Sequence, residues 1–123
     1  MKRGLILFAH GARDPRWAEP FETIANAVRD RAPGLAVRLA YLELMEPDLA
    51  SATDALAAEG CMRIDVLPLF LGSGGHLRRD LPPLVEALAG RHPTIAVTLH
   101  PAAGEAPALI SAMAEHALAI SQS

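Results

Sequence analysis

Four short apolar runs, each followed by a longer segment with helical spacing, constrain this chain more than any other feature of its sequence. The runs cover residues 5–9, 35–44, 63–70 and 94–99. Short apolar runs of this kind predict strands rather than helices. The unbroken apolar character of 5–9 is typical of a strand that is covered on both faces of its sheet.

The segments between and after these runs predict four helices. Proline or aspartate at their starts and glycine at their ends favour helix boundaries there. The expected helices begin at Asp14–Pro15, Pro47–Asp48, Asp80–Pro83 and Pro107, and end before Pro33, at Gly60, at Gly90 and at Ile120. In the last helix, an apolar stripe recurs at helical spacing, and we expect it to lie in the core. The stripe consists of Leu109, Ile110, Met113, Ala117 and Ile120.

This alternation predicts an α/β fold with a parallel sheet. We expect a three-layer α/β/α arrangement in which right-handed crossovers place helices on both faces of four strands. The expected strand order is 2-1-3-4, as in flavodoxin-like domains. At 123 residues the chain forms one domain, 1–123, with a real core. It is too short for two full catalytic lobes, so a site that needs two lobes requires a dimer.

Composition argues against several kinds of partner. The formal charge of -3 and the absence of long runs of like charge give no basic surface for nucleic acid. The apolar stretch after Lys2 and Arg3 is too short for a signal peptide or a membrane span. Cys61 is the single cysteine, which fits a reducing compartment. We therefore expect a cytoplasmic protein that binds neither nucleic acid nor membrane.

Three polar side chains follow strands at what the predicted order makes one edge of the sheet. His10 follows the first run, Glu43 ends the second, and His76 lies in the glycine-rich loop after the third. Ligands of parallel sheets bind at the carboxyl ends of the strands. Imidazoles and a carboxylate suit a divalent ion such as cobalt, nickel, iron or zinc, and three ligands leave positions open for catalysis. A structural zinc is disfavoured, because Cys61 would lie at the opposite edge.

Three strings in the chain resemble a known family. They are LILFAHGARDPRW, LAYLELMEPDL and VLPLFLGSGGHLRRDLP. Together they are similar to the small form of the sirohydrochlorin cobaltochelatases, which are class II tetrapyrrole chelatases, and the similarity covers nearly the whole chain. It implies a chelatase-like fold and a lyase that inserts Co2+, or else Ni2+ or Fe2+, into sirohydrochlorin on the way to cobalamin or siroheme. It also implies a homodimer in which two short chains replace the two halves of longer relatives, and a metal that is substrate rather than a permanently bound cofactor.

The resemblance also implies roles for individual residues at matching positions. His10 resembles the metal ligand that also accepts protons, His76 the second metal ligand, and Glu43 a carboxylate at the metal. Glu46 and the segment 71–76 match positions that contact the tetrapyrrole. That segment consists of Leu71, Gly72, Ser73, Gly74, Gly75 and His76, and Ser73 is its main departure from relatives.

A tetrapyrrole with many carboxylates requires cations and free backbone N–H groups around it. Arg13 and Arg78, with Arg16 and Arg79 beside them, lie at the expected edge. Glycines in the segment 71–76 would let the backbone approach a flat ligand closely.

Other interpretations of these residues remain open. A histidine after a strand often only packs or caps, Glu43 could pair with Arg13, and Glu46 could simply favour a helix start. His100 is a secondary candidate at the end of the fourth strand. A non-catalytic metal or tetrapyrrole carrier would use the same edge. The string HGARDP also resembles histidine phosphatases, although Ala9 stands where they have arginine.

Overall fold

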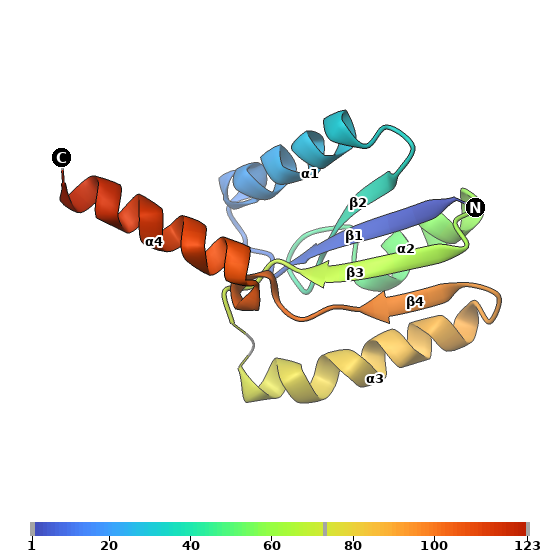
Figure 1. Ribbon diagram of the computed structural model, residues 1–123. Coiled ribbons are helices and arrows are strands. Elements are labelled where there is room, and N and C mark those ends of the chain that lie inside the picture. The colour runs from blue at the N-terminus through green and yellow to red at the C-terminus, as the bar shows by residue number, and fades with distance from the viewer. Residues whose placement is uncertain (1, 73, 123) are drawn as a thin grey trace.

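The protein is described here by a computed structural model that covers residues 2–72 and 74–122, with the backbone alone for His76 (Figure 1). Its strands form one parallel sheet in the order β2-β1-β3-β4. They are β1 (Arg3–Ala9), β2 (Ala36–Tyr41), β3 (Arg63–Pro68) and β4 (Ala96–Leu99). The predicted α/β class and strand order are confirmed.

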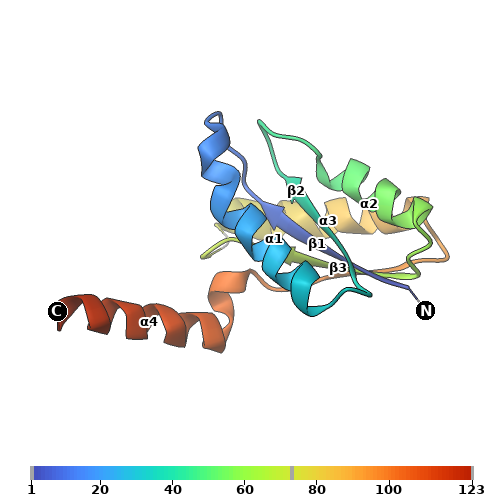
Figure 2. The ribbon, with the colours of Figure 1, turned by 90° about the horizontal axis from the view of Figure 1, so that it is seen from above.

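Helices cover both faces of the sheet (Figure 2). On one face α1 (Glu19–Arg31) packs Ala25 against Leu7 and Val37. On the other, α2 (Leu49–Ala58) and α3 (Gly75–Arg91) enclose a larger cluster that includes Ile6 and Phe8. Successive residues of β1 therefore enter opposite layers, which explains why its run is apolar throughout.

The first two helices begin close to the predicted residues. Asp14 caps a short 3-10 helix, η1 (Pro15–Ala18), by accepting a 2.9 Å hydrogen bond from the backbone N–H of Arg16, and α1 follows directly. Asp48 caps α2 by accepting a 2.8 Å bond from the N–H of Ser51. Gly60 follows the end of α2 with φ +91°, the left-handed conformation that glycine adopts without strain.

The third helix begins earlier than predicted, which corrects the expected start at Asp80. Gly74 is the N-cap of α3, and Pro82 and Pro83 lie inside the helix. A proline in a helix interior costs about 3 kcal/mol because it lacks an N–H and crowds the preceding turn. Core packing of Leu81, Val85 and Leu88 outweighs that cost here, since each is only 5% exposed.

Two strands end before the predicted residue. β2 stops at Tyr41 rather than at 44, and residues 42–47 form successive bends that include φ +64° at Leu44 and a cis Glu46–Pro47 bond. β3 stops at Pro68 rather than at Phe70. These shorter strands lengthen the loops at the carboxyl edge of the sheet.

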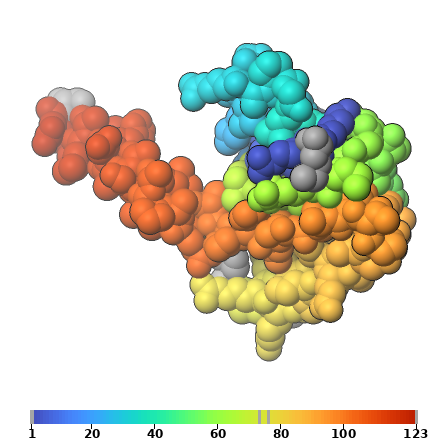
Figure 3. All heavy atoms as spheres, turned by 45° about the vertical axis from the view of Figure 1, so that its right-hand side comes forward, coloured from blue at the N-terminus to red at the C-terminus, as the bar shows by residue number. Residues whose placement is uncertain are grey.

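The prediction that the apolar stripe of the last helix lies in the core is wrong. All of α4 (Pro107–Ser121) is described, and none of its residues is buried. The exposed fractions are 55% for Ile110, 49% for Met113 and 63% for Ile120. The helix extends away from the body in both ribbon views and stands out as an arm in the space-filling view (Figures 1, 2 and 3). Its direction is fixed by the 3-10 helix η2 (Ala103–Glu105) and by the extended Ala106.

Within the described ranges, no helix has both the length and the apolar character needed to cross a membrane.

Candidate functional site

The side chains of His10 and Glu43 meet at the carboxyl edge of the sheet. His10 follows β1 directly, and Glu43 lies in the bends after β2. Nε2 of His10 is 3.3 Å from Oε1 of Glu43, and the two side chains are 51% and 56% exposed. An imidazole and a carboxylate this close, and open to solvent, can bind one cation together or move a proton between them.

The backbone holds these two segments together. The N–H of Leu42 donates to the carbonyl of Ala9 at 2.9 Å, and the N–H of Glu43 donates to the carbonyl of His10 at 3.1 Å. Gly11 has φ +98°, and a Cβ added there would lie 1.8 Å from the carbonyl oxygen of Glu43. Only glycine therefore fits after His10 while the Glu43 backbone stays where it is.

Phe70 supports His10 from the core side. The two rings meet edge to face with their centroids 6.0 Å apart, and Phe70 in turn contacts Phe8 at the same centroid distance. The backbone of Phe70 is also tied down, because its carbonyl accepts a 2.8 Å bond from Gly104. Edge-to-face packing favours one orientation of the imidazole. Sequence reasoning missed Phe70, because its contact with His10 joins two segments that are far apart in the sequence.

An open hollow of about 950 Å³ lies beside this pair, over the bends after β2. Its lining includes Glu43 and Glu46, both predicted site residues, and Leu44, which the prediction omitted. Leu44 is 60% exposed and is held at φ +64°. The lining of the hollow thus combines an exposed apolar side chain with two carboxylates. Tyr41, a buried residue of the lining, has its pKa raised, chiefly by desolvation.

The glycine-rich segment lies at the same edge, at the N-terminus of α3. His76 is the second residue of that helix, but its side chain, like the whole of Ser73, falls outside the described part of the chain. Leu71 is 68% exposed. Apart from its neighbours in the chain, a Cβ added at Gly72, Gly74 or Gly75 would meet no atom of the described residues within 4 Å. Packing against the described residues therefore does not require these glycines.

The four predicted arginines differ in the contacts that they make with described residues. Arg16 forms a forked pair with Asp14, which lowers the pKa of that carboxyl. Arg78 lies 3.4 Å from Glu105, and Arg79 donates to the carbonyl of Gly75. Arg13 is exposed and forms no ion pair with any described residue.

Glu43 pairs with His10 and not with Arg13, which the sequence left as an alternative. His100 pairs with a different carboxylate, since its Nε2 is 2.8 Å from Oδ1 of Asp65 on β3. In the described part of the chain, which leaves out the His76 side chain, no three metal-ligating residues form a cluster. A metal held by His10 and Glu43 would need further ligands from elsewhere.

Comparison with known proteins points to one family. The family model described as CbiX matches residues 4–119. The sirohydrochlorin cobaltochelatase of Methanosarcina acetivorans is 31% identical over 84 residues, which cover 68% of this chain and 65% of that protein, slightly less than two thirds of its length.

Two crystal structures are similar in fold. A CbiX protein from Marinobacter aquaeolei VT8 has a TM-score of 0.83 and 34% identity, with 98% of this chain and 99% of that chain covered. The sirohydrochlorin chelatase SirB from Bacillus subtilis subspecies spizizenii, in complex with cobalt, has a TM-score of 0.72 and 24% identity, with 82% of this chain and 44% of that chain covered. At that identity, the second similarity concerns the fold alone.

Proposed function

This chain belongs to the CbiX family, and from that membership we propose that it inserts a divalent cation into sirohydrochlorin. Co2+ is the proposed metal, with Ni2+ and Fe2+ as alternatives, and the ion is a substrate rather than a resident cofactor. The observation that carries the proposal is the solvent-open pair of His10 and Glu43, 3.3 Å apart at the carboxyl edge of the sheet. The proposed reaction type comes from the similarity to the sirohydrochlorin cobaltochelatase of Methanosarcina acetivorans.

The chemistry of insertion suits these side chains. A dication entering a free-base tetrapyrrole must lose bound water, and two pyrrole protons must leave the ring. A neutral imidazole can bind the ion or accept a proton near neutral pH, since its ordinary pKa is about 6.5. In the proposal, His10 and His76 bind the metal, and Glu43 accepts the second pyrrole proton or holds the hydrated ion. His10 accepts the first pyrrole proton on the ring nitrogen that becomes free as the metal passes to the tetrapyrrole.

The surroundings suit a flat, anionic ligand. We assign one face of the tetrapyrrole to the hollow that Glu46 lines and to the segment 71–76, where glycines leave the backbone open to solvent. Arg13 is free of ion pairs with described residues, and Arg78 would exchange Glu105 for a substrate carboxylate. Free N–H groups at the start of α3 add to the attraction of carboxylates.

We also propose a cytoplasmic homodimer that acts in the biosynthesis of cobalamin or siroheme. At the proposed site, the described side chains bring together only two metal ligands, His10 and Glu43. A second copy would complete the enclosure of the ring.

An insertion assay tests the function. Purified protein is incubated with sirohydrochlorin and Co2+, Ni2+ or Fe2+, and the absorption spectrum is followed against a protein-free control. We expect His10→Ala to slow insertion about 100-fold or more, the usual contribution of a positioned acid or base. His92→Ala is the matched control, because His92 pairs with Asp54 on α2, away from the His10–Glu43 pair, and it should insert at the wild-type rate.

The outcomes separate the alternatives. A protein that binds the ring or the ion but inserts no faster than the protein-free mixture is a carrier, and the chelatase proposal fails. Wild-type insertion by His10→Ala and Glu43→Gln would leave the family assignment intact and remove the proposed mechanism. Phosphomonoester hydrolysis that is lost in His10→Ala and indifferent to added metal would favour the phosphatase alternative.

A further inference from the structure

Leu44 lies in a segment, 41–45, whose other apolar side chains pack inward. Tyr41 is 5% exposed, and both Leu42 and Met45 pack against core clusters. Leu44 lies between them in the sequence and is 60% exposed. A single exposed leucine is ordinary on a protein surface, so its exposure alone indicates no function. The backbone that holds this leucine in place is what sets it apart.

The backbone at Leu44 forms a strained turn. Its φ is +64°, and no other non-glycine residue in the described part of the chain has a positive φ. The N–H of Met45 donates a 2.8 Å hydrogen bond to the carbonyl of Glu43, which closes a three-residue γ-turn around Leu44. With a positive φ at its centre, this is the rarer and more strained form of that turn. Because the Cβ of leucine disfavours the left-handed region, the fold holds Leu44 there at a cost in stability.

The strained turn is fixed to the candidate site through Glu43. The N–H of Glu43 donates to the carbonyl of His10 at 3.1 Å, and the carbonyl of Glu43 closes the turn around Leu44. Gly11 lies against that carbonyl, since a Cβ added there would be 1.8 Å from its oxygen. The side chain of Glu43 faces His10 at 3.3 Å. The turn that exposes Leu44 is therefore joined directly to the pair of His10 and Glu43.

The hollow that Leu44 lines is acidic. The described residues of its lining include three carboxylates, Glu43, Glu46 and Asp48, and no lysine or arginine. Carboxylates of a ligand would be repelled there, because like charges a few ångströms apart raise the energy of the complex. The part of a ligand that meets Leu44 is therefore an uncharged surface, and the anionic groups of the same ligand must lie outside the hollow.

We infer that Leu44 is a binding residue for the tetrapyrrole, and that its side chain packs against the flat, uncharged face of the ring beside His10 and Glu43. Contact with the ring removes apolar surface of both partners from water, which favours binding. A non-glycine residue held at positive φ is typical of such a role, since strained backbone conformations cluster at ligand sites. The inference rests on the proposed function, because it takes a tetrapyrrole as the ligand.

Two substitutions separate the strain at Leu44 from its contact with the ring. Leu44→Asn removes the apolar side chain and introduces a residue that tolerates positive φ, whereas Leu44→Ala removes the side chain and keeps the strain. We expect Leu44→Asn to unfold at a higher urea concentration than Leu44→Ala, and at the same or a higher concentration than the wild type. An asparagine variant that unfolds before the wild type would show that Leu44 stabilises the fold, and would overturn the inference.

Titration with sirohydrochlorin in the absence of metal tests the contact itself. We expect both variants to bind the ring about tenfold more weakly than the wild type, because an apolar contact is lost. Leu44→Met keeps an apolar side chain of similar volume and should bind as the wild type does. Met62→Asn is the matched control. Met62 is 46% exposed and precedes β3 at the opposite edge of the sheet, so its substitution should leave binding unchanged.

Insertion kinetics show where the contact acts. A contact made equally in the ground state and in the transition state lowers KM without changing kcat, so we expect Leu44→Asn and Leu44→Ala to raise the KM for sirohydrochlorin at the wild-type kcat. Unchanged binding in both variants, or a loss confined to kcat, would overturn the inference and leave the proposed function standing. A wild type that binds no sirohydrochlorin would overturn the proposed function and the inference with it.

Discussion

Gly11 is the residue on which the spacing of His10 and Glu43 depends. Its φ is +98°, and a Cβ at this position would lie 1.8 Å from the Glu43 carbonyl oxygen, which leaves no room for a side chain. We expect Gly11→Ala to lower the free energy of unfolding by about 2 kcal/mol or more, because it combines backbone strain with a clash. Insertion should fall with it, since the bend that carries Glu43 must move. Chemical denaturation and the insertion assay measure the two effects.

Gly34→Ala is the control for this substitution. Gly34 precedes β2 and is not among the positive-φ glycines of the described chain, and a Cβ there would meet no atom of the described residues within 4 Å. Its stability should be unchanged or raised by up to about 1 kcal/mol, through a less flexible unfolded chain. An equal loss in both variants would show that the close approach at Gly11 is not what makes it necessary.

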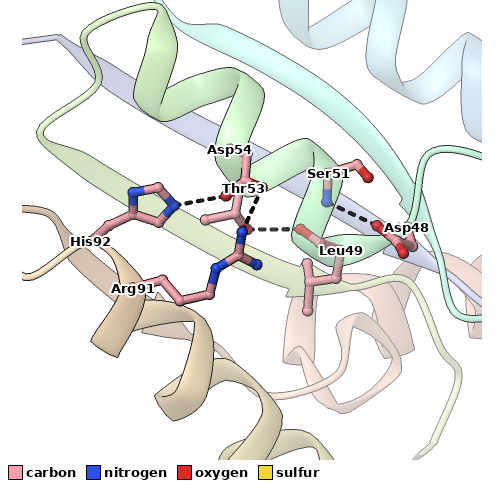
Figure 4. A network of polar contacts seen from close by, with 7 residues as sticks. All are labelled: Asp48, Leu49, Ser51, Thr53, Asp54, Arg91 and His92. Atoms are coloured by element: carbon pink, nitrogen blue, oxygen red, sulfur yellow. Dashed lines mark hydrogen bonds and ion pairs between the residues drawn. The ribbon is translucent and has the colours of Figure 1, made fainter.

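The contact between α2 and the end of α3 makes the stability of the fold depend on pH (Figure 4). Oδ1 of Asp54 is 2.8 Å from Nε2 of His92, and Oδ2 is 2.8 Å from Arg91. The pKa of Asp54 is lowered, first by the hydrogen bond with His92. A carboxyl whose pKa is lowered by folding stabilises the fold above its unfolded pKa, and this contribution is lost as the pH falls through the folded value.

Asp54→Asn should therefore melt at a lower temperature than the wild type near neutral pH. The difference should begin to shrink as the pH falls through about 4, the ordinary range for aspartate, and should vanish at lower pH. Thermal melts between pH 7 and pH 2 check this, with Asp30→Asn on the exposed side of α1 as the control. A difference that stays constant across this range would contradict the assignment.

At the scale of the elements, the stability of α2 depends on its N-terminal cap. Asp48 accepts a 2.8 Å bond from the N–H of Ser51, and the helix buries Leu49, Ala52 and Leu56 in the main core cluster. We expect Asp48→Ala to cost about 1 kcal/mol of stability, while Asp48→Asn, which keeps an acceptor oxygen, should cost less. Urea denaturation measures both. Equal losses would mean that the charge of Asp48, rather than its acceptor, stabilises the helix.

Local signals were sufficient to predict most elements. The caps Asp14 and Asp48 and the stop at Gly60 act within a few residues of themselves, and the structure places the helix boundaries beside them. The start of α3 was not predictable in this way. Pro82 and Pro83 indicate a helix start by local chemistry, but burial of residues four and more positions apart carries the helix through them.

The residues of the candidate site also fall into predictable and unpredictable ones. The predicted strand order alone brings His10 and Glu43 to one edge, because it makes β1 and β2 neighbours. Phe70 and Leu44 could not be assigned to the site from the sequence. Their roles depend on a ring contact across two loops and on the path of the bends after β2, neither of which has a local pattern.

For the molecule as a whole, the apolar stripe of α4 was identified correctly as a stripe and wrongly as core. Helical spacing shows which residues share a face, but it does not show which surface covers that face. The chain's own sheet does not cover the stripe here, because α4 leads away from it (Figure 2).

The proposed homodimer makes folding stability depend on protein concentration. Unfolding of a dimer includes its dissociation into two chains, and mass action opposes that step as the concentration rises. Each tenfold rise in concentration should stabilise the dimer by about 1.4 kcal/mol, which thermal melts over a hundredfold range would detect as a rising midpoint. A midpoint that does not move with concentration would mean that the folded unit is the single chain.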